Sequence, residues 1–284
     1  MIISVASGKG GTGKTTIAVN LALSISKGTC QLIDCDVEEP NSHLFLNPTL
    51  NKVTSVGIPV PRIDETKCTY CGRCAQVCEY HAIAVILKTI LIFDELCHGC
   101  GACSYLCPEK AIFEVEREIG IVQEGSANGI PFVNGVLNIG EPMASPLIRK
   151  VKERIQKDKV VILDAPPGTA CPVIETVKGS DFCILVTEPT PFGLNDLELA
   201  VGMLDKLGIP IGVVVNKADI GDREVWDYCQ SKNIPILLEI PMDRQIAESY
   251  SRGIPIVVEN PSYIPHFLNL FKKVEELYES SQRK

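Results

Sequence analysis

The sequence predicts an α/β fold with a mostly parallel, doubly wound sheet that is interrupted by a small inserted α+β domain. Short apolar runs alternate with helical stretches along most of the 284 residues, which is typical of parallel strands joined by helices. A cysteine-rich segment around residues 63–115 breaks this alternation and repeats itself at a period of 29 residues. We therefore expect a discontinuous main domain of residues 1–57 and 118–284, with residues 58–117 as the insertion.

The composition is that of a globular protein and excludes several classes. Hydrophobic residues make up 45% of the chain and charged residues 22%, and the length suffices for a sizeable α/β domain plus a small module. A net charge of −8 argues against nucleic acid as the main partner, because the Lys and Arg surplus that neutralises phosphates is missing. No apolar stretch is long enough to predict a membrane span.

The beginning of the chain predicts a βαβ unit. Ile2–Ala6 is a short apolar run typical of a buried strand, and it leads directly into a glycine-rich loop over residues 8–13. Residues 15–26 have helical periodicity, and residues 31–36 form a second apolar run that ends in carboxylates. The two prolines within residues 58–62 favour a linker into the insertion. A first strand without a secretory leader, together with thiols in short repeated spacing, indicates a reducing cytoplasm.

Beyond the insertion the α/β alternation resumes. The last expected helix, over residues 262–278, has an apolar stripe without a flanking basic cluster, so we expect it to dock on the sheet rather than on a membrane surface. The other expected elements are helices over 144–156, 193–207, 222–232 and 243–251, and strands over 159–164, 182–187, 211–216 and 234–240.

Residues 8–15 contain a complete phosphate-binding motif. They read Gly-Lys-Gly-Gly-Thr-Gly-Lys-Thr, which matches G-x-x-x-x-G-K-[ST] between a predicted strand and a predicted helix. The glycines allow backbone N–H groups to surround phosphate oxygens, Lys14 is expected to reach the β- and γ-phosphates, and Thr15 is expected to bind Mg²⁺. A glycine-rich turn without a ligand is the alternative, which the strand and helix around the loop disfavour. The predicted ATP-binding residues of this segment are Gly10, Gly11, Thr12, Gly13, Lys14, Thr15 and Thr16.

Eight of the thirteen cysteines form two copies of C-x2-C-x2-C-x3-C, the bacterial-type spacing for a pair of [4Fe–4S] clusters. Zinc is the alternative, but it usually requires two C-x2-C pairs separated by a longer loop. In the cluster pattern the fourth cysteine of each run binds the other cluster. The first cluster is therefore predicted to be held by Cys68, Cys71, Cys74 and Cys107, and the second by Cys97, Cys100, Cys103 and Cys78.

The two cysteine runs differ after their fourth cysteine. Pro108 follows Cys107, as the pattern expects, but Glu79 follows Cys78. A carboxylate there would add negative charge near the clusters and favour their oxidised state. We expect redox-active clusters, although a structural role in stabilising a small insertion is an alternative.

Of the remaining cysteines, three lie in or beside apolar elements and are expected to pack as small hydrophobic residues: Cys30, Cys183 and Cys229. Cys171 follows the loop at Gly168. We expect it to be a packed thiol, with a shared metal site at a two-fold axis as the alternative.

The motifs together carry a family resemblance. The second lysine of the loop, Lys9, makes the segment resemble the deviant Walker A motif of the MinD/ParA/Mrp/nitrogenase-iron-protein class of ATPases. This resemblance covers residues 1 to about 57 and about 118 to the end. With the cysteine runs included, the chain resembles MinD-superfamily ATPases that contain an inserted two-cluster ferredoxin domain.

This resemblance implies a Mg²⁺-dependent ATPase that dimerises around ATP. Lys9 would reach the partner's phosphates, and Asp36 would position the attacking water, although Asp36 could instead cap the next turn. Asp164 would hold Mg²⁺ through a water molecule, and Gly168 would sense the γ-phosphate. Asn216, Pro241 and Asp243 would surround the adenine, although Asn216 could instead belong to a turn.

The expected function is ATP-dependent coupling of nucleotide state to electron transfer, or to metal-cofactor assembly, on a partner protein. Two alternatives come from other classes. One is spatial organisation of the cell, with the clusters as redox sensors, and the other is an iron–sulfur cluster carrier or scaffold.

Overall fold

The computed structural model describes residues 1–25 and 28–282. The chain forms two compact units. The large unit consists of Met1–Val53, Val122–Val136 and Ile148–Lys284, and the cysteine unit consists of Thr54–Ile121 and Leu137–Leu147. The cysteine unit contains the segment expected as the insertion and extends beyond it on both sides. Each unit is described separately below.

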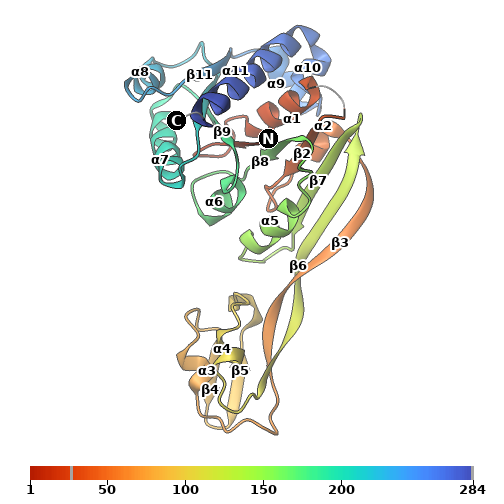
Figure 1. Cartoon of the computed structure of the whole chain (residues 1–284), viewed down its shortest axis with the longest axis vertical. Helices are drawn as coiled ribbons and strands as arrows, with labels where there is room; N and C mark the ends of the chain where they lie inside the picture. Colours follow the sequence, from red (N-terminus) through yellow and green to blue (C-terminus); the bar gives the residue numbers. More distant parts are fainter. Residues whose placement is uncertain (26–27, 283–284) are drawn as a thin grey trace. The chain divides into compact units, whose positions relative to one another are not determined.

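The main sheet confirms the predicted α/β class (Figure 1). Within the described residues it has nine strands in the order β11-β10-β9-β1-β8-β2-β7-β6-β3. From β11 to β7 all neighbouring strands are parallel. The bounds of the strands from β11 to β2 are β11 Ile236–Ile240, β10 Ile211–Asn216, β9 Phe182–Thr187, β1 Ile2–Ala6, β8 Val160–Asp164 and β2 Cys30–Asp34.

Helices cover both faces of the parallel part of the sheet (Figure 1). One face packs against α1 (Lys14–Ser24), α9 (Arg244–Ser251), α10 (Ile256–Glu259) and α11 (Ile264–Gln282). The other face packs against α6 (Cys171–Val177), α7 (Pro191–Leu207) and α8 (Glu224–Ser231). The helices α2 (Ser42–Leu46) and α5 (Ser145–Lys152) and the short 3₁₀ turn η2 (Pro261–Tyr263) complete this part of the chain.

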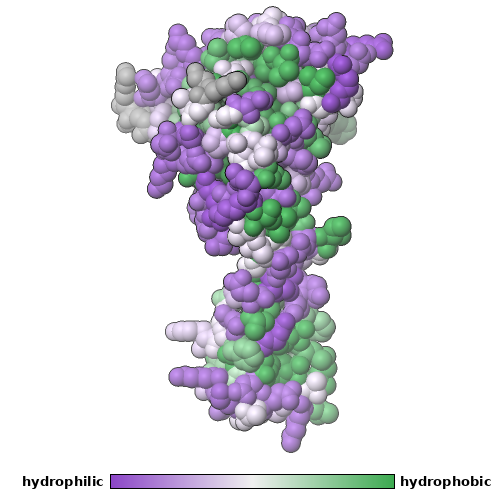
Figure 2. Space-filling view, turned by 90° about the vertical axis from the view of Figure 1, so that its right-hand side faces the viewer, coloured by the Kyte–Doolittle hydropathy of each residue, from purple (hydrophilic) through white to green (hydrophobic). Residues whose placement is uncertain are grey.

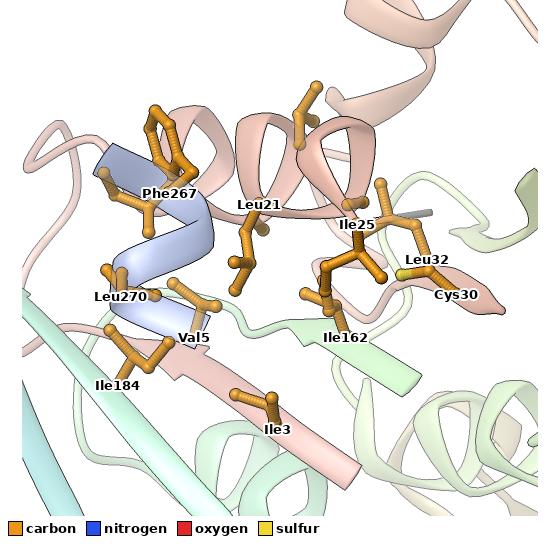
Figure 3. Close-up of a cluster of buried hydrophobic side chains, with 14 of the residues drawn as sticks. Ile3, Val5, Leu21, Ile25, Cys30, Leu32, Ile162, Ile184, Phe267 and Leu270 are labelled. Carbon is orange, nitrogen blue, oxygen red and sulfur yellow. The ribbon is translucent and has the colours of Figure 1, made fainter. Parts of the chain in front are cut away.

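The larger of these cores lies between β1, β8, α1 and α11 (Figure 3). Phe267 and Leu270 of α11 are fully buried beside Leu21 of α1. Each such side chain contributes about 1.5–3 kcal/mol by leaving water. The apolar stripe of the last helix therefore docks on the sheet, as its sequence predicted.

Several predicted boundaries differ from the observed ones. Helix α1 begins at Lys14 and ends at Ser24, and Ser26, the last residue of the predicted helix, lies outside the described residues. Strand β2 ends at Asp34 rather than Asp36, because the Asp36 N–H donates to Asp34 Oδ1 at 3.0 Å and turns the chain.

The linker predicted over residues 58–62 is wrong. These residues lie inside β3 (Thr49–Ile63), which is 15 residues long and contains both prolines. β3 is the last strand in the sheet order and has only β6 (Ile112–Ala127) as its neighbour. An edge strand leaves one row of N–H groups unpaired, so proline, which lacks that donor, is tolerated there. The hairpin partner of β6 is β7 (Ile130–Leu137).

The cysteine unit contains the internal duplication that the 29-residue period predicted. Its short helices α3 (Arg73–Gln76) and α4 (Ala102–Tyr105) each follow a glycine with positive φ, 78° at Gly72 and 72° at Gly101. The same left-handed conformation recurs at His81 and Lys110, again 29 residues apart. An antiparallel hairpin of β4 (Ile83–Ile86) and β5 (Thr89–Ile92) and the turn η1 (Asp94–Leu96) connect the two halves.

Candidate nucleotide site and cysteine cavities

A pocket of about 1340 Å³ opens in the large unit where several parallel strands end. The carboxyl ends of strands in open α/β sheets are where ligands generally bind. The pocket brings together most of the residues predicted for ATP: Gly10, Gly11, Gly13, Lys14, Thr15, Thr16, Asp36, Asn216, Pro241 and Asp243.

The glycine-rich loop adopts a conformation that depends on Gly13. Gly13 has φ 98° and ψ 20° directly before α1, and a Cβ there would lie 2.7 Å from Asn216 Nδ2. The Asn216 amide donates to the Thr12 carbonyl at 2.9 Å, and its Oδ1 accepts from the Lys217 N–H at 3.0 Å. The side chain of Asn216 thus supports the phosphate loop, which the sequence did not indicate.

Two opposite charges are buried beside the loop. Lys14 is 7% exposed and Asp164 is fully buried. Burial lowers the pKa of Lys14, although the carboxylates of Asp164 and Asp36 oppose this shift. Burial raises the pKa of Asp164 to about 6, against the opposing effects of Thr15, Lys14 and Ser42. A buried ammonium and a buried carboxylate are expensive unless each has a partner.

The Asp164 carboxylate has one oxygen available. Its Oδ2 accepts from the Ser42 hydroxyl at 3.0 Å, whereas its Oδ1 is buried without a hydrogen-bond partner among the described residues. The Thr12 hydroxyl is likewise buried and without a partner there. Oxygen atoms of this kind next to the Thr15 hydroxyl are the ligands that Mg²⁺ or its water shell requires, so the residues fit the predicted cation.

Asp34 organises the turn that carries Asp36. Its carboxylate accepts the N–H groups of Asp36, Asn41 and Ser42 at 3.0–3.1 Å. Burial raises the pKa of Asp34 well above its usual range, and the neighbouring Asp164 raises it further. Burial also raises the pKa of Asp36 to about 6. Asp36 therefore faces the pocket at the end of a turn that a neighbouring buried carboxylate holds.

Four predicted residues do not line this pocket: Thr12 and Asp164, which are buried, and Lys9 and Gly168. Lys9 extends toward Glu188, with its Nζ 3.9 Å from Glu188 Oε2, and the same carboxylate binds Lys217 at 2.7 Å. Gly168 is half-buried, with φ 94°, and its N–H donates to the Ser7 carbonyl at 3.0 Å. Its neighbour Pro167 does reach the pocket.

The opposite wall of the pocket is largely apolar. Pro241 and Asp243 belong to it, and the Asp243 side chain caps α9 by accepting the Gln245 N–H at 2.7 Å. Sequence reasoning missed the apolar residues of this wall, which come from α9 and α10: Ile246, Ala247, Tyr250 and Ile256. It also missed Glu39 and Asn41, which follow β2. An apolar slot opposite a phosphate loop suits a flat heteroaromatic base.

The eight cysteines of the two runs surround two cavities in the cysteine unit. The first cavity, of about 340 Å³, is lined by Cys68, Cys71, Cys74 and Cys107. The second, of about 380 Å³, is lined by Cys78, Cys97, Cys100 and Cys103. Each cavity thus groups three cysteines of one run with the fourth of the other.

Backbone N–H groups point at the cysteine sulfurs in the same way in both halves. The Ala82 N–H lies 3.2 Å from Cys78 Sγ, and its counterpart Ala111 N–H lies 3.3 Å from Cys107 Sγ. Burial raises the pKa of Cys103 to about 11. A thiolate in such a place needs N–H donors, which the backbone supplies. It also needs bound positive charge, which the iron of an iron–sulfur cluster would supply.

The cavities are not shaped around a single ion. In the part of the chain that the structure describes, no group of three or more His, Cys, Asp or Glu side chains is arranged to hold one metal ion. A cubane is bound at separate iron corners, so its ligands surround a volume rather than a point.

The expectation for Cys171 needs correction, and Glu79 differs in position from its counterpart. Glu79 is exposed and is absent from the lining of the second cavity, whereas its counterpart Pro108 lines the first. Glu79 nevertheless directly follows the predicted ligand Cys78, so the expected effect of its charge on the clusters stays a prediction. Cys171 is exposed as the first residue of α6 rather than packed. Cys30, Cys183 and Cys229 are buried, as expected.

Comparison with known proteins places the chain in a family. Residues 3–256 match the family described as the CobQ/CobB/MinD/ParA nucleotide binding domain. The chain belongs to this family. The predicted resemblance to MinD and ParA proteins is thereby confirmed.

Two relatives span nearly the whole chain. The uncharacterized protein MJ0579 of Methanocaldococcus jannaschii is 32% identical to this chain over 95% of it. The uncharacterized protein MJ0578 of the same organism is 33% identical over 97% of it. Each match covers 97% of the relative's own length. An iron–sulfur cluster carrier protein of Aquifex aeolicus is 26% identical over 98% of this chain and 68% of its own.

Solved structures of MinD proteins share the fold. The septum site-determining protein MinD of Pyrococcus horikoshii, solved with Mg-ADP, is similar with a TM-score of 0.59 and 22% identity over 97% of this chain and 96% of its own. None of the described helices is long and apolar enough to span a bilayer.

Proposed function

We propose that this protein is a Mg²⁺-dependent ATPase that carries two [4Fe–4S] clusters and couples its nucleotide state to electron transfer or to metal-cofactor assembly on a partner. One observation carries the proposal. A single chain contains a phosphate-loop pocket with buried Lys14 and Asp164 and, in its other unit, two cavities that each gather four cysteines.

ATP would lie with its phosphates in the glycine-rich loop and its base against the apolar wall. The backbone N–H groups at Gly11 and Gly13 and the Lys14 ammonium would hold the phosphate oxygens. Mg²⁺ would be held by the Thr15 hydroxyl, with Asp164 reaching it through water, and would neutralise charge on the transferred phosphate.

Hydrolysis would proceed by in-line attack of water on the γ-phosphorus. The oxygen–phosphorus bond to ADP breaks as the bond to water forms, and phosphate leaves with ADP. Asp36 would orient the water, since it is half-buried at the rim of the pocket. Gly168 would respond to the γ-phosphate through the loop that hydrogen-bonds to Ser7.

Dimerisation would bring in the residue that the pocket lacks. Lys9 lies against Glu188 of its own chain and outside its own pocket. In a homodimer around ATP it would leave this pair and approach the partner's phosphates, adding positive charge where the transition state is most negative.

The two cysteine cavities would hold the clusters with the ligand sets predicted from the spacing. Bound clusters would give the protein a one-electron capacity at each site. The chain's own residues position the sulfurs and supply N–H donors to them.

A cluster carrier is a second candidate, favoured by one observation. The Aquifex aeolicus relative that covers 98% of this chain is named an iron–sulfur cluster carrier protein. In a carrier, a cluster would leave for an acceptor, whereas an electron-transfer protein keeps both.

The experiment uses the full chain with its clusters reconstituted without oxygen. Phosphate release with Mg-ATP, iron and sulfide content, and particle mass by light scattering with ADP or ATP test the three parts separately. We expect ATP hydrolysis, iron and sulfide for two cubanes, and an ATP-dependent dimer. Electron transfer to an acceptor protein should depend on ATP, and an acceptor that gains iron instead would establish the carrier. Absence of ATP hydrolysis, or of cluster iron, would overturn the corresponding part.

A further inference from the structure

The two cysteine cavities have equivalent ligands, but their linings differ. Tyr70, Arg73 and Pro108 line the first cavity, where their counterparts in the other half are Gly99, Ala102 and Glu79, and Glu79 does not line the second cavity.

Two further differences involve residues that line their cavities on both sides. The residue after the first cysteine is Thr69 in the first cavity and His98 in the second. The residue two positions after the fourth cysteine is Glu109 in the first cavity and Tyr80 in the second. All four residues line their cavities.

At the second cavity these two positions form an aromatic stack. The rings of Tyr80 and His98 are parallel within 5°, and their centroids are 3.4 Å apart. The equivalent residues of the first cavity, threonine and an exposed glutamate, have no rings to stack. The asymmetry is therefore local, since the ligands and the backbone around them are the same in both halves.

The stack joins the two chain segments that supply the ligands of the second cavity. Tyr80 lies two residues after Cys78, and His98 lies between Cys97 and Cys100. Each ring covers one face of the other, and Tyr80 is 43% exposed. Both rings are exposed and line the cavity, so the pair lies at its rim.

We propose that the Tyr80–His98 stack is a water-excluding cover that makes the second cluster harder to reduce than it would be without it. The proposal rests on the clusters of the proposed function and concerns only their difference. Reduction adds an electron to a site that is already anionic, and a site that excludes water stabilises the extra charge less. Solvent exposure is one of the factors that set cluster potentials.

The other walls of the second cavity are partly apolar and partly formed by the carboxylate residue Glu114. Pro59 and Pro61 of β3 line this cavity, and a Cβ on Gly99 would lie 3.0 Å from the Pro59 carbonyl. The two proline rings line the second cavity, and Ile63 and Ile90 line the first.

The test is a redox titration of the reconstituted full chain, followed by electron paramagnetic resonance. Tyr80→Ser removes one ring, and His98→Thr copies the residue of the first half. We expect both to shift one of the two reduction steps to a higher potential and to leave the other in place. Tyr80→Phe keeps the stack and should leave both steps unchanged. The control is Tyr105→Ser, since Tyr105 is 88% exposed and lines neither cavity.

Three outcomes would overturn the proposal. The first is that neither reduction step shifts in Tyr80→Ser and His98→Thr. The second is that both steps shift equally. The third is that these variants lose the iron of one cluster while Tyr80→Phe retains it, because the stack would then be a structural clamp. Failure of the proposed function is a distinct result, because the unmodified chain would then bind no clusters.

Discussion

The large unit builds its pocket from buried polar contacts, whereas the cysteine unit builds its cavities mainly from the cysteines themselves. Lys14, Asp34 and Asp164 are buried around the pocket and are supported by a core between the sheet and its helices. The cysteine unit exposes many large apolar residues, among them Ile86, Leu87, Phe93, Leu96, Tyr105 and Phe113, and Figure 2 shows hydrophobic residues gathered on its visible face. The comparison teaches that the first site is formed by folding, while the second, under the proposed function, would depend on its clusters to complete it.

Lys14→Ala should produce the largest effect and should confine it to the large unit. Removing the buried ammonium takes away a contact to the phosphates, and we expect ATP hydrolysis to fall about 1,000-fold. Phosphate release measures the loss, and iron content should equal that of the unmodified chain. A variant that also loses iron would show that the two sites do not form independently.

Lys9→Ala should separate binding from hydrolysis. Because Lys9 lies outside its own pocket, ATP binding should persist. The hydrolysis rate should fall about 100-fold, because the partner no longer receives this positive charge, and the ATP-dependent dimer should be lost. Equilibrium binding and light scattering measure the two effects. Lys206→Ala, at an exposed lysine of α7, is the control. An unchanged hydrolysis rate would contradict the role of Lys9 across a dimer.

Cys68→Ala tests how far the cysteine unit depends on its ligands. We expect the loss of the first cluster, which is half of the iron. Amide hydrogen exchange should become faster in the cysteine unit and stay unchanged in the large unit. Cys171→Ala is the matched control, because this exposed cysteine lines neither cavity. Full iron in Cys68→Ala would refute the ligand assignment.

Asn216→Ala should produce the smallest effect. Loss of its hydrogen bond to the Thr12 carbonyl costs about 1 kcal/mol, which is several-fold in nucleotide affinity. If Asn216 only supports the phosphate loop, ATP and GTP should weaken equally. If it also contacts adenine, as the sequence resemblance implies, the preference for ATP over GTP should fall. Competition binding with both nucleotides distinguishes these outcomes.

Local signals predicted most of the parallel sheet. The strands Ile2–Ala6, Phe182–Thr187 and Ile211–Asn216 have the predicted bounds, because each is a short, mostly apolar run. The phosphate loop and the two cysteine runs were equally visible, since their chemistry requires fixed residues at fixed spacing. The roles of the individual site residues stay predictions.

What the sequence could not reveal depends on contacts between distant segments. Ser42 reaches Asp164 across 122 positions, and Tyr250 joins the pocket only through the packing of α9. The linker prediction at residues 58–62 failed for a related reason, because whether proline is tolerated depends on the strand's place in the sheet. The Tyr80–His98 stack likewise joins residues whose contact no local pattern encodes.

The two prolines of β3 have a consequence for how the protein behaves among its own copies. An exposed sheet edge offers a row of free N–H and C=O groups to which a strand of another molecule can add. Pro59 and Pro61 lack such donors, and Pro61 is buried and Pro59 half-buried beside the second cavity. This end of β3 therefore offers little free backbone to a strand of another molecule and resists edge-to-edge aggregation.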